Sequence, residues 1–245
     1  MLARSPPRTL AGKMEKAMDE TAGNIGDVQA RKVILVDDHP MVRQGIRMLL
    51  ARAPDLTVCG EADSASEALK VIEQTSPDLA VVDLTLKESS GLELIKDIRV
   101  RYPNLLVLVL SMRDEGFYAE RVLRAGARGY VTKEEGPRRV MEGMRKVLSG
   151  GIYISEKMAS KVMSKIVAGA DKATVSPIDA LTDRELEVFE LIGQGLPTRE
   201  VARKLHISPK TVDSHREHIK EKLALDSATE LLKHAIQWVQ CQKNL

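Results

Sequence analysis

Between Lys32 and Gly150, five short apolar runs alternate with stretches that have the apolar spacing of a helix. This alternation favours a parallel sheet, since each parallel pair of strands needs a crossover that a helix can form. Strands inside such a sheet are buried on both faces, and VILV, LAVV and LLVLVL are apolar throughout. We therefore predict an α/β fold with a doubly wound, five-stranded parallel sheet. The runs are Val33–Val36, Leu56–Cys59, Leu79–Val82, Leu105–Leu110 and Gly129–Val131.

The composition excludes several classes of protein. No window approaches the roughly 18 apolar residues that a membrane-spanning helix needs, so we expect no membrane partner. Cys59 and Cys241 lie far apart, without histidines at the spacing of a cysteine zinc site, which indicates a reducing compartment, the cytoplasm, and no disulfide framework. The formal net charge is only +2, so a case for binding nucleic acid must rest on local sequence.

Changes in composition divide the chain into four segments. Residues 1–30 contain prolines and glycines but no long apolar run, which predicts a disordered N-terminal extension. Residues 31–150 hold the α/β pattern, and residues 151–180 form a less regular linker with a helix predicted over Glu156–Ala168. Residues 181–241 form a second, all-α domain of four helices. Those helices are predicted at Asp183–Gln194, Thr198–Leu205, Pro209–Leu223 and Ala228–Val239.

Polar residues follow four of the predicted strands. Asp37 and Asp38 follow the first strand, Asp83 the third and Ser111 the fourth, and Lys133 comes just after the fifth. In an open parallel sheet, ligands bind at the carboxyl ends of the strands where the strand order reverses. With the order 2-1-3-4-5, these residues converge on one acidic pocket. Taken singly, these residues also have ordinary explanations: an aspartate after a strand is commonly a helix cap or turn residue, Asp38 and Ser111 are candidate helix caps, and Lys133 is a candidate solvated surface amine.

The chemistry of such a pocket suits phosphoryl transfer. Three packed carboxylates repel one another unless a cation offsets their charge, and a half-open site with only oxygen ligands suits Mg²⁺. A carboxylate can attack a phosphoryl group to form an acyl phosphate when positive charge offsets the phosphoryl oxygens. We predict Asp83 as the nucleophile, Asp38 as a metal ligand and Asp37 as a more distant one. Lys133 is predicted as the phosphate counter-ion and Ser111 as a hydroxyl donor.

These residues give the segment from about Arg31 to Gly150 a resemblance to the receiver domain of two-component response regulators, which has a flavodoxin-like fold. The resemblance implies that Asp83 is the phospho-acceptor and that Ser111 and Tyr130 form its switch pair. It also implies that the backbone carbonyl of Thr85 joins the carboxylates as a metal ligand. The positions that match the family are Asp37, Asp38, Asp83, Ser111, Tyr130 and Lys133.

One position departs from the receiver pattern. Receivers commonly carry proline four residues after the acceptor, where this chain has Lys87. We therefore expect a less rigid loop with an extra positive charge near the phosphate. The departure bears on the lifetime of the phosphoryl group and on the choice of donor.

The helical domain has the pattern of a helix-turn-helix. Thr182 and Glu185 have capping-box spacing at its first helix, and Ser208 and Pro209 begin its third helix. A short helix, a tight turn and a longer helix with a polar face make up this motif. Residues 181–240 carry nine basic and ten acidic side chains, however, which equally fits a helix-packing module with a solvated face.

The stretch LTDRELEVFELIGQGLPTREVARKLHISPKTVDSHREHIKEKL resembles the LuxR-type helix-turn-helix along its whole length. Pro197 stands where that family usually has a capping serine, so we expect Thr198 to cap the second helix. The matching residues are Glu185, Gly195, Glu200, Val201, Ala202, Leu205, Ser208, Thr211, Val212, His215, Ile219, Lys222 and Leu223.

In such modules the second helix of the motif enters the major groove of double-stranded DNA by its N-terminal half. The groove-facing candidates are Asp213, Ser214 and Glu217. Ala228–Val239 carries apolar residues that suit pairing of two modules, so we expect a homodimer in the active state. Two routes of activation fit the sequence equally: receiver-driven dimerisation, and release of a recognition helix that the receiver masks. The predicted contacts to the DNA backbone are Lys210, Thr211, Arg216 and Lys220.

We therefore predict a cytoplasmic transcription regulator in which a sensor histidine kinase donates phosphoryl to Asp83, with Mg²⁺ as cofactor. RNA polymerase is a further candidate partner, and the protein itself is not an enzyme beyond slow autodephosphorylation. An alternative is a phospho-signalling adaptor whose helical domain binds protein or RNA. A phosphohydrolase is a third class, but it needs an acid two residues after the nucleophile, where this chain has Thr85.

Overall fold

The computed structural model describes residues 30–87, 89–168 and 177–243. Residues 1–29, on which the prediction of a disordered extension falls, lie outside this described part. Residues from Arg31 onward form one compact unit by their internal contacts. In the described residues, no helix has both the length and the apolar character needed to cross a membrane.

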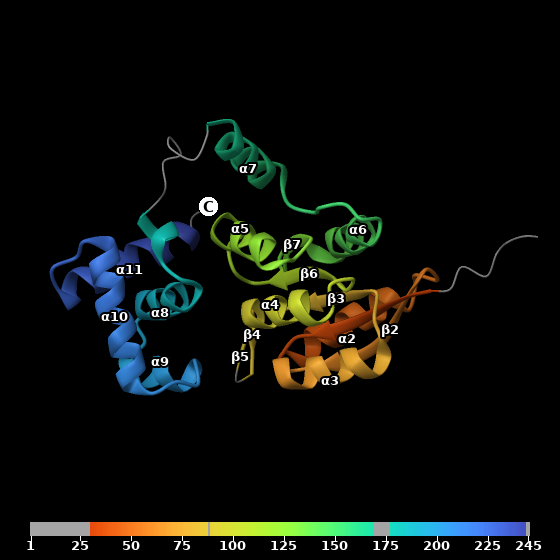
Figure 1. Cartoon of the computed structure of the whole chain (residues 1–245), viewed down its shortest axis with the longest axis horizontal. Coiled ribbons are helices and arrows are strands. Elements are labelled where there is room, and N and C mark those ends of the chain that lie inside the picture. The colour runs from red at the N-terminus through yellow and green to blue at the C-terminus, as the bar shows by residue number, and fades with distance from the viewer. Residues whose placement is uncertain (1–29, 88, 169–176, 244–245) are drawn as a thin grey trace, which may run out of the picture. The chain divides into compact units, whose positions relative to one another are not determined.

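Five parallel strands form the sheet of the α/β domain (Figure 1). Their order is β2-β1-β3-β6-β7, which confirms the predicted order when the five long strands are counted along the chain. Two of the strands, β1 and β2, extend two or three residues beyond the predicted apolar runs, and β6 and β7 end one residue later than predicted. The strands are β1 (Arg31–Val36), β2 (Leu56–Ala62), β3 (Leu79–Val82), β6 (Leu106–Ser111) and β7 (Gly129–Thr132).

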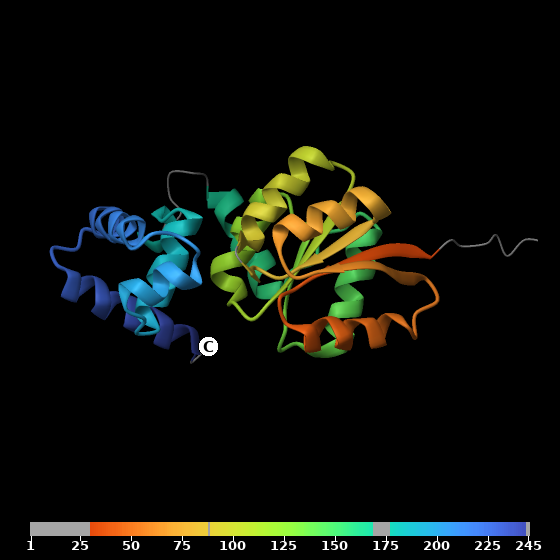
Figure 2. The ribbon, with the colours of Figure 1, turned by 90° about the horizontal axis from the view of Figure 1, so that it is seen from below.

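Helices cover both faces of this sheet, as Figure 2 shows. Because successive side chains of a strand point to opposite faces, Val33 and Leu35 of β1 pack in one apolar core and Ile34 and Val36 in another. α2 and α6 contribute to the first core, and α3, α4 and α5 contribute to the second. The helices are α2 (Pro40–Leu50), α3 (Ala65–Thr75), α4 (Gly91–Arg101), α5 (Glu115–Ala125) and α6 (Gly136–Leu148).

A two-stranded hairpin, β4 (Thr85–Leu86) and β5 (Ser89–Ser90), follows β3 and was not expected. Two residues per strand are too few to show an alternating pattern in the sequence. The hairpin connects the carboxyl end of β3 to α4, so it lies directly beside the predicted acceptor Asp83.

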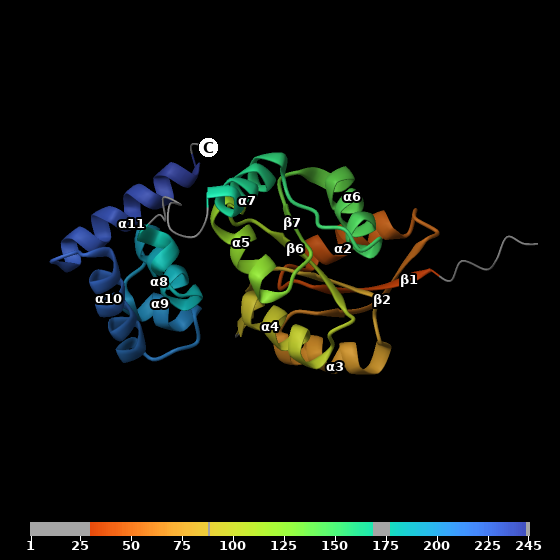
Figure 3. The same ribbon diagram turned by 45° about the horizontal axis from the view of Figure 1, so that its top comes forward.

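The predicted linker begins against the sheet. Tyr130 N donates to Tyr153 O and Tyr153 N donates to Arg128 O, at 2.8 and 3.0 Å, so this stretch pairs with the edge strand β7. Helix α7 (Glu156–Ala168) has the predicted bounds and packs on α5, as Figure 3 shows. A short 3₁₀ helix, η1 (Pro177–Ala180), precedes the all-α domain.

Four helices form the all-α domain: α8 (Asp183–Gly193), α9 (Thr198–Lys204), α10 (Pro209–Leu223) and α11 (Ala228–Lys243). The capping box of Thr182 and Glu185 and the N-cap of Ser208 are present as predicted. The prediction that Thr198 caps α9 is wrong, because Pro197 is the N-cap and provides no side-chain hydrogen bond. A Cβ at Gly193 would lie 2.3 Å from the carbonyl oxygen of Ala235, so glycine is required where α8 crosses α11.

Candidate functional site

The carboxyl ends of β1, β3 and β7 bring two acids and an amine into direct contact. Lys133 Nζ lies 2.7 Å from Asp37 Oδ2 and 2.7 Å from Asp83 Oδ2. The side chains of Lys133, Asp37 and Asp83 are only 8, 5 and 3% exposed. Lys133 is thus part of a buried ion-pair triad rather than a solvated surface amine.

The two acids keep Lys133 charged. Burial by itself lowers the pKa of this amine, but hydrogen bonds to Asp37 and Asp83 and their negative charges raise it by more, so the net shift is upward. Lys133 therefore stays an ammonium ion at neutral pH. A fixed positive charge beside a nucleophilic carboxylate is what an incoming phosphoryl group requires.

Asp38 lies at the mouth of the pocket beside His39. His39 Nδ1 is 2.6 Å from Asp38 Oδ1, and its backbone N donates to Asp37 Oδ1 at 2.8 Å. His39 is the N-cap residue of α2 and there is no side-chain capping bond, so Asp38 does not cap this helix. The sequence reasoning did not single out His39 as a pocket residue, although it directly follows the acid pair.

The oxygen atoms of the pocket fit a hard divalent cation. Asp37, Asp38 and Asp83 each offer a carboxylate oxygen, and these three oxygens and a ring nitrogen of His39 lie within 4.8 Å of one another. Among the described residues, Asp83 Oδ1 is buried and has no hydrogen-bond partner. A buried carboxylate oxygen without a donor is costly unless a cation or a further group contacts it. The donor set therefore fits Mg²⁺.

Ser111 and Tyr130 lie behind the pocket on neighbouring strands. Ser111 ends β6 with a fully buried side chain, and its Oγ accepts from Arg113 N at 3.4 Å rather than capping α5, whose N-cap is Asp114. Tyr130 is 1% exposed, and its hydroxyl donates to Arg113 O at 2.8 Å. Burial raises the pKa of the Tyr130 phenol, so it remains a neutral donor. Both predicted switch residues thus contact the backbone of the same loop.

Gly91 lies directly against the backbone of Asp83, and no pattern in the sequence pointed to it. It begins α4, and its N donates to Leu84 O at 2.9 Å. A Cβ at this position would lie 2.0 Å from the carbonyl oxygen of Asp83, which is far inside van der Waals contact. The absence of a side chain at Gly91 therefore allows α4 to approach the backbone of the predicted acceptor.

Lys87 makes a defined contact outside the pocket. Its Nζ lies 2.5 Å from Asp63 Oδ2, and its backbone N donates to Asp63 O at 3.2 Å. The ion pair is exposed, with 60% of the Lys87 side chain accessible. Lys87 thus ties the β4–β5 hairpin to the end of β2. The expected lower rigidity of the loop and the positive charge near the phosphate stay predictions.

The helix-turn-helix is formed by α9, a turn and α10. His206 in the turn has a φ of 53°, and Ile207 N donates to Ala202 O at 3.0 Å. Val212 and Ile219 of α10 are fully buried, and His215 lies half-buried on the same side. The predicted groove-facing residues and the first two predicted DNA-backbone contacts are all exposed, Thr211 on a flank of α10 and the others opposite its buried stripe. They are Lys210, Thr211, Asp213, Ser214 and Glu217.

Two predicted backbone contacts have partners inside the protein. Arg216 is half-buried and its Nη1 donates to Thr198 Oγ1 at 3.0 Å, which joins α10 to the first turn of α9. Lys220 Nζ lies 2.8 Å from Glu217 Oε2 on the same helix. Their role at DNA stays a prediction, and the structure assigns Arg216 a second role in holding the motif together.

Side chains of α5 and its preceding loop contact α8. Arg113 Nη1 pairs with Glu190 Oε2, and the Tyr118 hydroxyl donates to the same oxygen at 2.8 Å. Arg121 Nη1 lies 3.1 Å from Asp183 Oδ1. Because the backbone of Arg113 also accepts from Tyr130, this network connects the region behind the pocket to the all-α domain.

Comparisons with known proteins match each of the two domains to a protein family. Residues 33–145 match the family described as response regulator receiver domain, and residues 179–235 match the family described as bacterial regulatory proteins, luxR family. The chain therefore belongs to the response regulators that join a receiver domain to a LuxR-type DNA-binding domain, the NarL/FixJ type. It is a phosphorylation-dependent, DNA-binding response regulator of a two-component system.

Individual relatives match over most of their length. The oxygen regulatory protein NreC of Staphylococcus carnosus is 36% identical over 210 residues, covering 84% of this chain and 97% of the relative. NreC of Staphylococcus aureus is 33% identical over the same shares. The response regulator RcsB of Salmonella typhimurium has a similar structure, with a TM-score of 0.63, 26% identity and coverage of 85 and 98%.

One RcsB structure from Salmonella enterica serovar Typhimurium is bound to the promoter P1flhDC in the presence of the phosphomimetic BeF3⁻. It has a TM-score of 0.60 and 27% identity to this chain, covering 84% of this chain and 98% of that one. Another structure contains two RcsB dimers bound to two parallel DNAs, with a TM-score of 0.52.

Proposed function

We propose that Asp83 accepts a phosphoryl group from a sensor histidine kinase. The observation that carries this proposal is the buried triad in which the Lys133 ammonium contacts both Asp37 and Asp83. The amine offsets negative charge at the carboxylate, and it is placed to contact a phosphoryl oxygen once Asp83 is modified. The remaining Asp83 oxygen, Oδ1, lacks a hydrogen-bond partner in the described part of the chain and is the candidate attacking atom.

Asp37, Asp38 and Asp83 would hold Mg²⁺ together with the backbone carbonyl of Thr85, which begins β4 two residues after the acceptor. The ion supplies positive charge that offsets the phosphoryl oxygens during transfer. Asp37 then has a double contact, because one of its oxygens accepts from Lys133 and the other from His39. The pocket acts as a phospho-acceptor with at most slow autodephosphorylation and no further enzymatic activity.

Ser111 and Tyr130 are proposed to relay phosphorylation to the loop of Arg113. A phosphoryl group on Asp83 attracts the Ser111 hydroxyl, and Ser111 Oγ is then lost as an acceptor for Arg113 N. Movement of this loop changes the pairing of Arg113 with Glu190 of α8. Phosphorylation would thereby weaken a contact that holds the all-α domain in its present arrangement.

Contacts of the receiver domain support activation by pairing rather than by exposure of α10. The charged contacts reach α8, and the Phe117 ring packs edge-on against Trp238 of α11 with centroids 5.0 Å apart. The groove-facing residues of α10 are already exposed. We infer that phosphorylation releases α11 for homodimerisation, which doubles the phosphate contacts and sets the half-site spacing.

The active dimer is proposed to bind double-stranded DNA in the cytoplasm through the N-terminal half of α10, and RNA polymerase is its candidate further partner. Lys210 and Thr211 lie at the first turn, where backbone phosphates pass a recognition helix. Asp213 and Glu217 are acids on the groove face, and an acid lowers affinity for DNA unless it accepts a hydrogen bond, for example from cytosine N4.

The test combines phosphorylation with DNA selection. Wild-type protein and the Asp83→Asn variant are incubated with Mg²⁺ and an acyl-phosphate donor, and intact mass is measured before fragments are selected from random duplex DNA. We expect one phosphoryl group and phosphorylation-dependent selection of a motif with wild type only. Phosphorylation of the Asn variant to the same extent would refute Asp83 as acceptor. Binding to RNA or protein with no selected duplex would instead support the adaptor.

A further inference from the structure

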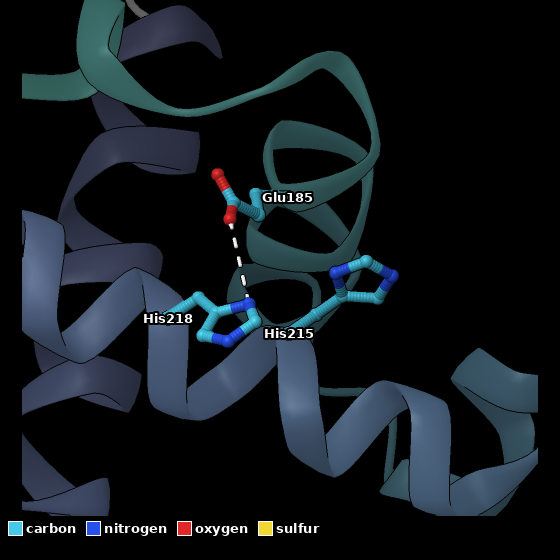
Figure 4. Close-up of side chains that lie close together, drawn as sticks. All are labelled: Glu185, His215 and His218. Carbon is cyan, nitrogen blue, oxygen red and sulfur yellow. Dashed lines mark ion pairs between the residues drawn. The ribbon is translucent and has the colours of Figure 1, made fainter.

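Two histidines and a glutamate meet between α8 and α10, far from the phospho-acceptor pocket in the sequence (Figure 4). His215 and His218 are three residues apart on α10 and therefore project from neighbouring turns. Glu185 of α8 faces them, with its Oε1 3.9 Å from His218 Nδ1. One ligand atom from each residue can be chosen so that all lie within 4.8 Å of one another. The proposed role of α10 in DNA binding does not use this cluster.

Glu185 is already held in place for a ligand role. Its side chain is 5% exposed, and its Oε2 accepts from Thr182 N at 2.7 Å and from Lys222 Nζ at 2.6 Å. These two donors fix the carboxylate, and Oε1 is the oxygen that faces His218. Hydrogen bonds to the second oxygen of a ligating carboxylate commonly orient metal ligands in proteins.

The protonation states at neutral pH also suit a metal. Burial lowers the pKa of His215, so this imidazole is neutral and offers a lone pair. Burial by itself raises the pKa of Glu185, but hydrogen bonds from Lys222 and Thr182 lower it by more, so Glu185 is ionised. A neutral imidazole and a carboxylate are the forms that bind metal ions without first losing a proton.

We propose that Glu185, His215 and His218 bind a divalent transition-metal ion of the zinc class, with water in the remaining position. Two imidazoles and one carboxylate form a ligand set typical of zinc. Bond lengths of about 2.1 Å at tetrahedral angles place donor atoms about 3.4 Å apart, so donors that lie within 4.8 Å of one another must move closer by up to about 1.4 Å. The His218 side chain is 59% exposed and is free to make that movement.

A bound ion would connect α8 to α10 without covering the groove-facing residues of α10. Lys222 opposes the ion, because its ammonium pairs with the same carboxylate at 2.6 Å. The two effects of Lys222 can be separated: Lys222→Gln keeps a hydrogen-bond donor for Glu185 but removes the opposing charge, so it should strengthen metal binding, whereas replacing any of the three ligands should weaken it.

The experiment titrates Zn²⁺ into the full chain by calorimetry in the presence of excess Mg²⁺, which under the proposed function fills the acidic pocket of the receiver. We expect one Zn²⁺ site whose affinity falls at least about tenfold in His218→Ala, an exposed position, and in Glu185→Gln, where glutamine can keep the capping box. His234→Ala, an exposed histidine on α11, is the matched control and should bind Zn²⁺ as the wild type does. Equal binding by all four proteins would overturn the proposal.

A second measurement separates metal binding from a simple loss of folding. Zn²⁺ should raise the melting temperature of the wild type and of His234→Ala but leave that of His218→Ala unchanged. Lys222→Gln should bind Zn²⁺ several-fold more tightly than wild type. A Lys222→Gln variant that binds Zn²⁺ no more tightly than wild type would show that Glu185 does not hold the ion, and it would also overturn the proposal.

Discussion

Replacing Lys133 with methionine tests whether the triad is the centre of the pocket. The change removes the ammonium but keeps an unbranched apolar side chain of similar length. Two carboxylates, Asp37 and Asp83, then lose a partner at 2.7 Å while remaining buried. Removing one member of a buried ion pair costs about 3–5 kcal/mol. Because the pocket opens to solvent beside Asp38, whose side chain is 22% exposed, we expect the lower end of this range, about 3 kcal/mol.

The effect of Lys133 should depend on pH and on Mg²⁺ in a defined direction. Its folded-state pKa is raised above the ordinary value of 10.5, so its contribution to stability is fully present at neutral pH. That contribution is lost only as the pH rises through the raised value. Mg²⁺ offsets the same carboxylates, so it should restore more stability to the variant than it adds to the wild type.

The assay is urea unfolding followed by far-UV circular dichroism, at neutral pH with and without Mg²⁺. Lys87→Met is the matched control, because it removes a lysine from an exposed ion pair with Asp63 and should change the midpoint little. A Lys133→Met variant that is no less stable than Lys87→Met, or that gains nothing extra from Mg²⁺, would refute the view that Lys133 neutralises the pocket.

Three further predictions address the remaining contacts. Gly91→Ala places a methyl group against the Asp83 carbonyl, so it should lower the free energy of unfolding in urea by about 1–3 kcal/mol and slow phosphorylation by an acyl-phosphate donor. Gly45→Ala, in open space on α2, is the control and should neither destabilise the protein nor slow phosphorylation. Arg113→Ala removes the contact with α8 and should raise DNA affinity of the unphosphorylated protein by up to about tenfold, about 1.4 kcal/mol, in a fluorescence-anisotropy titration; unchanged affinity would contradict the proposed relay. Glu217→Ala should relax the preference for the specific DNA sequence, whereas Lys210→Ala should weaken binding to all duplexes and reduce the slope of log affinity against log salt concentration by about one. Equal losses of affinity for specific and random DNA in both variants would contradict these separate roles.

Much of the fold could be predicted because its signals are local. Buried parallel strands are continuous apolar runs, and the helix caps at Thr182 and Ser208 are short-range patterns. The hairpin β4–β5 gave no such signal because each strand has two residues. The strand-end rule predicted that Asp37, Asp83 and Lys133 lie together, as they do, but it could not predict Gly91, whose importance comes from a close approach to a backbone atom that only the folded chain creates.

By itself, the sequence determined which residues could carry charge at the strand ends and which helix could present a polar face. Only the tertiary structure decided how those charges pair. Lys133 contacts two acids at once, Lys87 is paired with Asp63, and Arg216 holds α9. The physical reason is side-chain length: lysine and arginine side chains extend several ångströms from the backbone, so their charged ends can pair with acids or carbonyls of segments distant in the sequence. Periodicity determines the face on which a side chain begins, whereas packing determines where its charged end is bound.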